Sequence, residues 1–141
     1  MKLFARSLCF AGFALASTTA SADTLSLVVE NIQKQEGVLM IALFDSAEAF
    51  NNSGAPVDAT IAKVTGETVK VLFEDVAPGQ YAIKMYHDAN ENGEMDTNMM
   101  GIPVETYGFS GNKGRFGPPP FEDAVFDVAE GDENVVTVKL R

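Results

Sequence analysis

Oxygen-bearing side chains recur at alternate positions in a short segment of the chain. Residues 88–96 read Asp-Ala-Asn-Glu-Asn-Gly-Glu-Met-Asp, a D-x-N-x-N-G-x-x-D pattern. Oxygen donors at positions 1, 3, 5 and 9, with Gly at position 6 and a backbone carbonyl at position 7, match the first nine positions of a calcium loop. A calcium ion takes six to eight oxygen ligands, which a tight turn of this spacing can present on one side. The pattern predicts a calcium site with five candidate ligands: the side chains of Asp88, Asn90, Asn92 and Asp96, and the carbonyl of Glu94.

The segment differs from an EF-hand in two respects. Position 12 is Met99 instead of a bidentate Glu, and a strand ending at His87 is expected before the loop instead of a helix. We therefore expect a weak site, with a dissociation constant of about 10⁻⁴ to 10⁻³ M. A turn without metal is the alternative, because Asn92-Gly93 is a strong turn signal and Asp and Asn side chains bond their own backbone in Asx-turns.

The chain is poor in residues that support catalysis. His87 is the only imidazole, Cys9 is the only thiol, and the acidic residues are scattered along the sequence. Zinc sites generally use three or four Cys, His or carboxylate ligands, so a single His is a weak basis for one. We interpret His87 as a hydrogen-bonded residue at the end of a strand. These observations predict a protein that is not an enzyme.

A second candidate site is aromatic. Segment 99–121 contains Tyr107, Phe109 and Phe116 among glycines and ends in Gly-Pro-Pro-Pro-Phe. Such rings can stack on a sugar or hold a peptide, so a carbohydrate- or peptide-binding module is an alternative function. Aromatic residues also commonly close the open end of a β-sandwich, and on that interpretation Tyr107, Phe109 and Phe121 are buried.

The first 22 residues have the pattern of a secretory signal peptide. Lys2 and Arg6 precede an apolar run over 8–16, and residues 20–22 read Ala-Ser-Ala, a small-x-small cleavage site. Nine apolar residues are too few for a membrane span, which needs about 20. We predict cleavage before Asp23 and a periplasmic or secreted protein, in preference to a retained anchor.

Composition limits the partners of the remaining domain, residues 23–141. The full chain of 141 residues has a formal net charge of −10, and loss of Lys2 and Arg6 makes it −12. This excess of acid disfavours nucleic acid and anionic membrane surfaces as partners. Cys9 would be removed with the signal peptide, so the mature domain would have no disulfide and would depend on its hydrophobic core.

Short apolar or alternating runs predict an all-β fold. The expected strands cover 24–32, 38–44, 60–64, 68–73, 80–87, 123–129 and 134–140. About seven strands without long helical periodicity indicate an antiparallel β-sandwich. The turn at Thr65-Gly66-Glu67 predicts a hairpin between the third and fourth strands. The run 38–44 lacks clean alternation, which indicates a central strand covered on both sides.

Three further features should position the candidate sites. Ser46 is a plausible N-cap for one helical turn. Pro78-Gly79 followed by Tyr81 predicts a tyrosine corner, with an ordinary type II turn as the alternative. Residues 88–121 contain no convincing strand, yet they are too apolar for disorder. We expect one long ordered loop that folds back over the sandwich.

Three ordered motifs resemble a known family. They are H-D-x-N-x-N-G-x-x-D at 87–96, G-I-P-x-E-x-Y-G-F-S at 101–110 and G-P-P-x-F at 117–121. Together they resemble the bacterial secreted family designated domain of unknown function 2141, over essentially all of residues 23–141. The resemblance implies a small exported sandwich, transthyretin-like or immunoglobulin-like, with no established activity. A transthyretin-like hydrolase is a further alternative, although that chemistry generally calls for several His and basic residues at one site.

Overall fold

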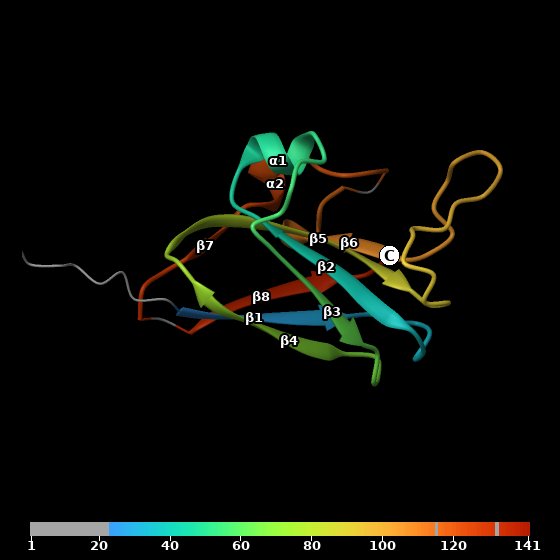
Figure 1. Cartoon of the computed structure of the whole chain (residues 1–141), viewed down its shortest axis with the longest axis horizontal. Helices are drawn as coiled ribbons and strands as arrows, with labels where there is room; N and C mark the ends of the chain where they lie inside the picture. Colours follow the sequence, from blue (N-terminus) through green and yellow to red (C-terminus); the bar gives the residue numbers. More distant parts are fainter. Residues whose placement is uncertain (1–22, 115, 132) are drawn as a thin grey trace, which may run out of the picture.

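The computed structural model describes residues 23–114, 116–131 and 133–141. Two β-sheets are stacked face to face, and two short helices lie together at one end (Figure 1). This architecture confirms the all-β sandwich. The predicted signal peptide, residues 1–22, lies outside the described residues. No helix in the described part of the chain has the length and apolar character that crossing a membrane requires.

The smaller sheet has three strands in the order β4-β1-β8. Its central strand β1 (Asp23–Glu30) pairs antiparallel with β4 (Val69–Val76) and parallel with β8 (Asn134–Lys139). The parallel pair departs from the expected antiparallel pattern. Alternate residues of β1 face the other sheet and are fully buried, as expected for a strand with one face on the core: Leu25, Leu27 and Val29.

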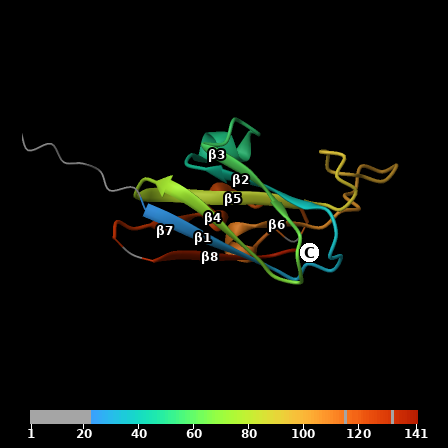
Figure 2. The ribbon, with the colours of Figure 1, turned by 60° about the horizontal axis from the view of Figure 1, so that its bottom comes forward.

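The larger sheet has five strands. Strands β3 (Asp58–Lys63), β2 (Val38–Phe44), β5 (Gly79–Asp88) and β6 (Tyr107–Phe109) are neighbours in that order. The first residues of β5 also pair with β7 (Phe126–Val128), so β6 and β7 follow one another along β5. The described residues therefore form eight strands, which Figure 2 shows from a second direction.

The inner faces of the two sheets form the main core. In the larger sheet, Ile41 lies opposite Met85 and Leu43 lies opposite Ile83, and all four side chains are buried. Tyr81 lies near the start of β5, and its hydroxyl donates a 2.8 Å hydrogen bond to the carbonyl of Ala77. The predicted tyrosine corner is therefore confirmed.

The predicted hairpin between 60–64 and 68–73 is wrong. Strand β3 pairs with β2, whereas β4 pairs with β1 in the other sheet, so the connection crosses from one sheet to the other. Val64 is buried in this crossing, and its N–H donates to the carbonyl of Gly37 at 3.1 Å. The Thr-Gly-Glu signal marks a change of chain direction, but it does not specify which sheet the next strand joins.

Two short helices cover one end of the larger sheet on its outer side. Helix α1 (Ala47–Asn51) is capped by Ser46, whose Oγ accepts a hydrogen bond from the N–H of Ala49 at 3.3 Å, as predicted. Helix α2 (Phe121–Ala124) occupies part of the predicted strand 123–129 and shortens it to β7. The change follows Pro120, whose extended conformation precedes the helix and whose carbonyl accepts the N–H of Asp123.

The long segment 88–121 is more structured than one loop. It contains β6, which was not predicted from the sequence because three residues around a glycine give no alternating pattern. Gly108 allows β6 to approach β8 closely, since a Cβ there would lie 2.7 Å from Cγ1 of Val138. The N–H groups of Tyr107 and Arg141 each donate to the carbonyl of the other, at 3.1 and 3.0 Å. The part before β6 projects from the end of the sandwich opposite the helices (Figure 1).

Candidate functional site

The outer face of the larger sheet carries two rows of side chains that cross four strands. Residues paired between neighbouring strands lie on the same face of a sheet, as do residues two apart along one strand. The first row consists of Ile61, Met40, Tyr86 and Tyr107, and the second of Ala59, Ala42, Lys84 and Phe109. Both rows face away from the sandwich core, yet seven of these eight residues are apolar or aromatic.

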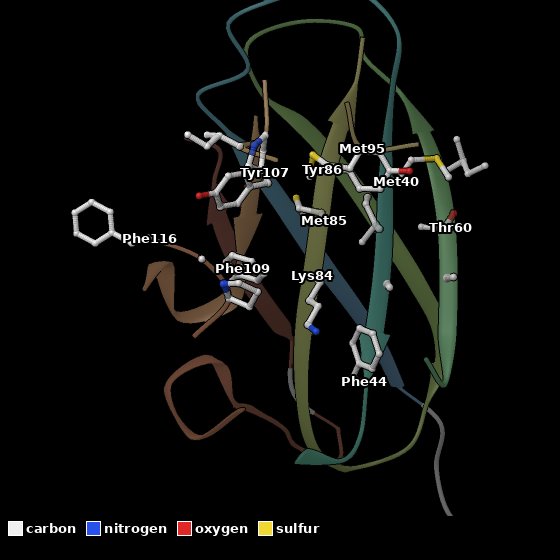
Figure 3. A pocket seen from close by; sticks show the side chains of 18 of the residues that line it. Met40, Phe44, Thr60, Lys84, Met85, Tyr86, Met95, Tyr107, Phe109 and Phe116 are labelled. Atoms are coloured by element: carbon white, nitrogen blue, oxygen red, sulfur yellow. The ribbon is translucent and has the colours of Figure 1, made fainter. Parts of the chain in front are cut away.

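These rows form the floor of an open groove of about 1310 Å³, here called the outer groove (Figure 3). Phe44, beside helix α1, lies at one end, and Met95 and Ile102 of the projecting loop lie at the other. Phe116 and Pro118 line the groove beyond β6. The volume exceeds the range of about 300 to 1,000 Å³ that is common for small-molecule pockets.

The predicted aromatic surface lies in this groove. Tyr107, Phe109 and Phe116 all line it, and the first two rings pack edge to face with centroids 5.7 Å apart. Phe109 is only 6% exposed, which confirms its predicted burial, whereas Tyr107 and Phe121 are half-buried. Phe116 is 98% exposed at the rim.

Ser110, directly after β6, holds the neighbouring Phe109 in place. The hydroxyl of Ser110 is fully buried, where it donates to the carbonyl of Ala124 at 2.6 Å and accepts the N–H of Ile83 at 2.8 Å. This hydroxyl therefore joins β5 to helix α2 directly beside Phe109. Phe109 packs there with Phe44 and other residues of a second, smaller apolar cluster.

Lys84 is the only charged residue among the described residues that line the outer groove. Its ammonium donates a hydrogen bond to the carbonyl of Phe50 and lies over the rings of Phe44 and Phe50, 5.3 and 4.4 Å from their centroids. Figure 3 shows Lys84 beside Phe44. It makes no ion pair with a described residue. Partial burial lowers the pKa of Lys84 below its usual value, because removal from water disfavours the charged form.

The floor of the groove was not predicted from the sequence. Met40 and Ala42 belong to the run 38–44, which was expected to be covered on both sides. Strand β2 is indeed central. Its inner residues are buried, and so is Phe44 at its outer end, whereas Met40 and Ala42 are half-exposed. The apolar character of both faces of this strand was the available signal. On the outer face it marks the groove at Met40 and the smaller apolar cluster at Phe44.

The candidate calcium loop begins at the end of β5. Asp88 is 1% exposed, and its carboxylate accepts the N–H groups of Asn92 and Gly93 at 3.1 and 2.7 Å. The carboxylate of Asp96 accepts the side-chain amides of Asn90 and Asn92 at 2.6 and 2.9 Å. The structure thus brings the four predicted side-chain ligands into one hydrogen-bond network.

Glu105 supports this loop from outside and was not singled out from the sequence. Its two carboxylate oxygens accept the N–H groups of Ala89 and Asp96, at 3.1 and 3.0 Å. Tyr86, in the groove floor, donates its hydroxyl to the carbonyl of Gly93 at 3.1 Å, which joins the loop to the groove. Burial raises the pKa of Tyr86, and the nearby charges of Asp88, Glu105 and Glu94 raise it further.

The loop geometry shows the hydrogen bonds of the predicted Asx-turns. The side-chain oxygens of Asn90 and Asn92 accept the N–H groups of Asn92 and Glu94, at 3.1 and 3.0 Å. A carboxylate oxygen has two lone pairs, so Asp88 and Asp96 retain capacity for a cation. Within the described residues, no group of three or more His, Cys, Asp and Glu side chains has the geometry of a metal site. Calcium binding stays a prediction.

His87 lies on the inner face of β5 and is buried. Its Nε2 lies 2.6 Å from the carbonyl oxygen of Glu36, and its backbone N–H donates to the carbonyl of Thr106. The interpretation of His87 as a hydrogen-bonded residue at the end of a strand is confirmed.

The comparison with known proteins identifies the family. A family model described as "Uncharacterized protein conserved in bacteria (DUF2141)" matches residues 27–136, and the chain belongs to this family. The resemblance of its three sequence motifs is thereby confirmed. No curated protein and no solved structure matches the chain.

Proposed function

For this member of a family without a described activity, we propose that the protein is a non-catalytic binding module that holds an apolar ligand in the outer groove. The observation that carries the proposal is the apolar outer face of the larger sheet. An antiparallel sheet with one face in water normally alternates apolar residues inside with polar residues outside. Here the outward rows are apolar too. A ligand that covers this face therefore lowers the free energy, by about 25 cal/mol for each Å² of apolar surface removed from water.

The polar groups of the groove favour an apolar ligand over a glycan. Among the described lining residues, side-chain oxygen or nitrogen atoms occur only in Thr60, Lys84, Tyr86 and Tyr107. Tyr86 and Lys84 already donate to backbone carbonyls. Moving the hydroxyls of a sugar ring out of water costs free energy unless they find new hydrogen-bond partners. This lining offers few such partners. The carbohydrate-binding alternative is therefore the weaker one.

The chemistry of the lining supports a non-catalytic role. Nucleophilic catalysis uses a nucleophile within hydrogen-bond reach of a base. Thr60 is the only aliphatic hydroxyl in the described lining, and no His, Asp or Glu lines the groove with it. His87 and Asp88 are buried in hydrogen bonds elsewhere. A transthyretin-like hydrolase has no support from this arrangement.

The groove proposal is tested with a neutral solvatochromic dye such as Nile red. Ala59 lies in the floor on an edge strand, and Ala59→Phe should fill the groove without burying a polar group. Val135→Phe is the matched control, because Val135 is an exposed apolar residue of β8 on the other sheet. We expect dye fluorescence to rise with the unaltered protein and with Val135→Phe, and to be lost with Ala59→Phe. No rise with the unaltered protein, or equal signals from both variants, would contradict the proposal.

Export is part of the proposal and rests on the residues of the first segment. A basic start, a short apolar run and Ala-Ser-Ala at 20–22 together fit a cleaved signal peptide. Amino-terminal sequencing of protein recovered from the periplasm or the medium should begin at Asp23. Recovery of the mature protein with Met1 intact would show that export by this route is wrong.

A weak calcium site in the loop 88–96 is a second proposal. The network that gathers the side chains of Asp88, Asn90, Asn92 and Asp96 supports it, as does the lack of an ion-pair partner for either Asp among the described residues. An ion there would have to replace the hydrogen bonds that the Asn amides donate to Asp96. Since Met95 lines the groove, calcium would also stiffen one end of it.

A further inference from the structure

The position of Lys84 indicates what kind of apolar ligand the groove takes. Its ammonium group has three N–H donors, and one of them reaches the carbonyl of Phe50. The other contacts of this group are the faces of two aromatic rings, and no carboxylate of a described residue pairs with it. A cation held against apolar walls in this way has lost part of its hydration.

The neighbours of Lys84 on the outer face of the sheet are apolar or aromatic. Within its own row it lies between Ala42 and Phe109, and the next row places Met40 and Tyr86 beside it. Partial desolvation, which also lowers the pKa of Lys84, strengthens any hydrogen bond from the ammonium to an anion. A single anionic group arriving at this point would therefore gain a charge-assisted hydrogen bond.

The shape of the floor provides for a chain attached to that anion. Ala42 and Ala59 have small side chains and leave a hollow beside Lys84, and the floor continues to Met40 and Ile61. From Phe44 to Met40 the strand rises by about 14 Å, at about 3.4 Å per residue. Beyond Met40 lie the apolar side chains of Met95 and Ile102. The groove thus pairs one cation near one end with a long apolar surface.

We propose that the ligand of the outer groove is a free fatty acid, with its carboxylate on Lys84 Nζ and its chain directed toward Met95. This inference rests on the proposed function of the groove and names the ligand class. The carboxylate would accept N–H groups of Lys84 that the Phe50 carbonyl does not use. The alkyl chain would cover Ala42, Ala59 and Met40.

The acidic net charge of the protein opposes the binding of an anionic ligand only weakly. The chain has a formal charge of −10, but charges separated by more than about 8 Å are largely screened at physiological ionic strength. No carboxylate belongs to the described lining of the groove. Contact with Lys84 therefore dominates once the ligand is in place.

The test compares acids with alcohols of the same chain length. Decanoate, laurate, decanol and dodecanol, each below its aggregation limit, are titrated against the protein preloaded with Nile red. We expect laurate to displace the dye at least tenfold more effectively than dodecanol. Each added methylene should raise affinity about fourfold in both series, as burial of a CH₂ group predicts. This comparison needs no variant, so it does not depend on a substitution that alters folding.

Two matched variants locate the carboxylate. Lys84→Met should abolish the preference for the acid while dodecanol still binds, and Lys84→Arg should retain the preference. Lys70→Met is the control, because Lys70 is an exposed lysine on β4 of the other sheet. Its acid preference should equal that of the unaltered protein.

The outcomes separate the ligand class from the function of the groove. Equal displacement of the dye by laurate and dodecanol, or an acid preference that survives in Lys84→Met, would overturn the fatty-acid proposal. The proposal that the groove binds an apolar ligand would be unaffected. Binding of phospholipid vesicles or of an apolar peptide that is tighter than binding of laurate, and that is lost in Ala59→Phe, would also overturn the fatty-acid proposal. If neither the dye nor any of the amphiphiles binds, the proposed function is wrong.

Discussion

The two outer faces of this sandwich are built on the same backbone geometry and differ in composition. On the smaller sheet, the register gives the rows Leu72, Ser26 and Val135, then Lys70, Val28 and Thr137, and then Glu30 with Lys139. Most of these side chains are polar or charged, and Lys139 lies 3.7 Å from Glu30. The rows of the larger sheet hold one charge, Lys84, among apolar and aromatic residues. Since the fold needs only the inner faces to be apolar, the outer rows of the larger sheet point to binding.

The largest expected effect distinguishes the buried wall of the groove from its exposed rim. Phe109→Ala should lower the free energy of unfolding by about 3 kcal/mol, because it leaves a cavity beside Phe44 and Ala82. Phe116→Ala should change it by no more than about 0.5 kcal/mol, since that ring is 98% exposed. Denaturant unfolding measures both. A change at Phe109 as small as that at Phe116 would show that β6 does not pack on the larger sheet.

Calcium should have an intermediate effect, confined to the loop end of the groove. At ten times the dissociation constant, a ligand of the folded state adds about 1.4 kcal/mol to the free energy of unfolding. For a domain of this size the melting temperature should then rise by about 3 to 6 °C. Magnesium should do less, because it requires tight octahedral geometry and keeps its water.

A pair of carboxylate variants makes the calcium experiment specific. Asp96→Asn removes a charge but keeps an oxygen in the network, and it should abolish the calcium-dependent rise. Glu91→Gln removes a charge from the same loop at a position outside the predicted ligand set, and it should keep the rise. An identical melting curve in 10 mM calcium and in excess chelator would favour the Asx-turn without metal.

The smallest expected effect on stability tests the contrast between the faces directly. Ile61 on β3 and Leu72 on β4 are 63% and 53% exposed, one on each outer face. Ile61→Lys and Leu72→Lys should each change the free energy of unfolding by no more than about 0.5 kcal/mol. Only Ile61→Lys should weaken the binding of a neutral apolar dye. Equal losses of dye binding in both variants would mean that the two faces do not differ in function.

Local sequence patterns predicted most strands but not the groove, because the groove depends on how distant strands pair. Alternation along β1 and the Pro-Gly-x-Tyr corner are properties of neighbouring residues, and both were read correctly. The hairpin at 65–67 failed because a turn signal does not specify the sheet that the next strand joins. The groove floor depends on the register of four strands, which places Lys84 between Ala42 and Phe109. Nothing within the sequence around Lys84 indicates those neighbours.

The candidate calcium loop was likewise predictable from the sequence only where its residues are contiguous. The oxygen pattern from Asp88 to Asp96 was visible because it is contiguous, and these side chains form one hydrogen-bond network in the structure. Glu105 completes the network from nine residues beyond Asp96. Its role depends on the chain returning past the loop, where Thr97 and Pro103 form an isolated bridge.

Methyl NMR of methionine tests the central claim, that the outer groove binds an apolar ligand, most directly. Met40 and Met95 line the groove, whereas Met99 and Met100 are exposed and lie outside its lining. With methyl-labelled methionine, saturating laurate or Nile red should shift the signals of Met40 and Met95 and leave those of Met99 and Met100 in place. Unchanged Met40 and Met95 signals at saturation, or shifts limited to Met99 and Met100, would contradict the account.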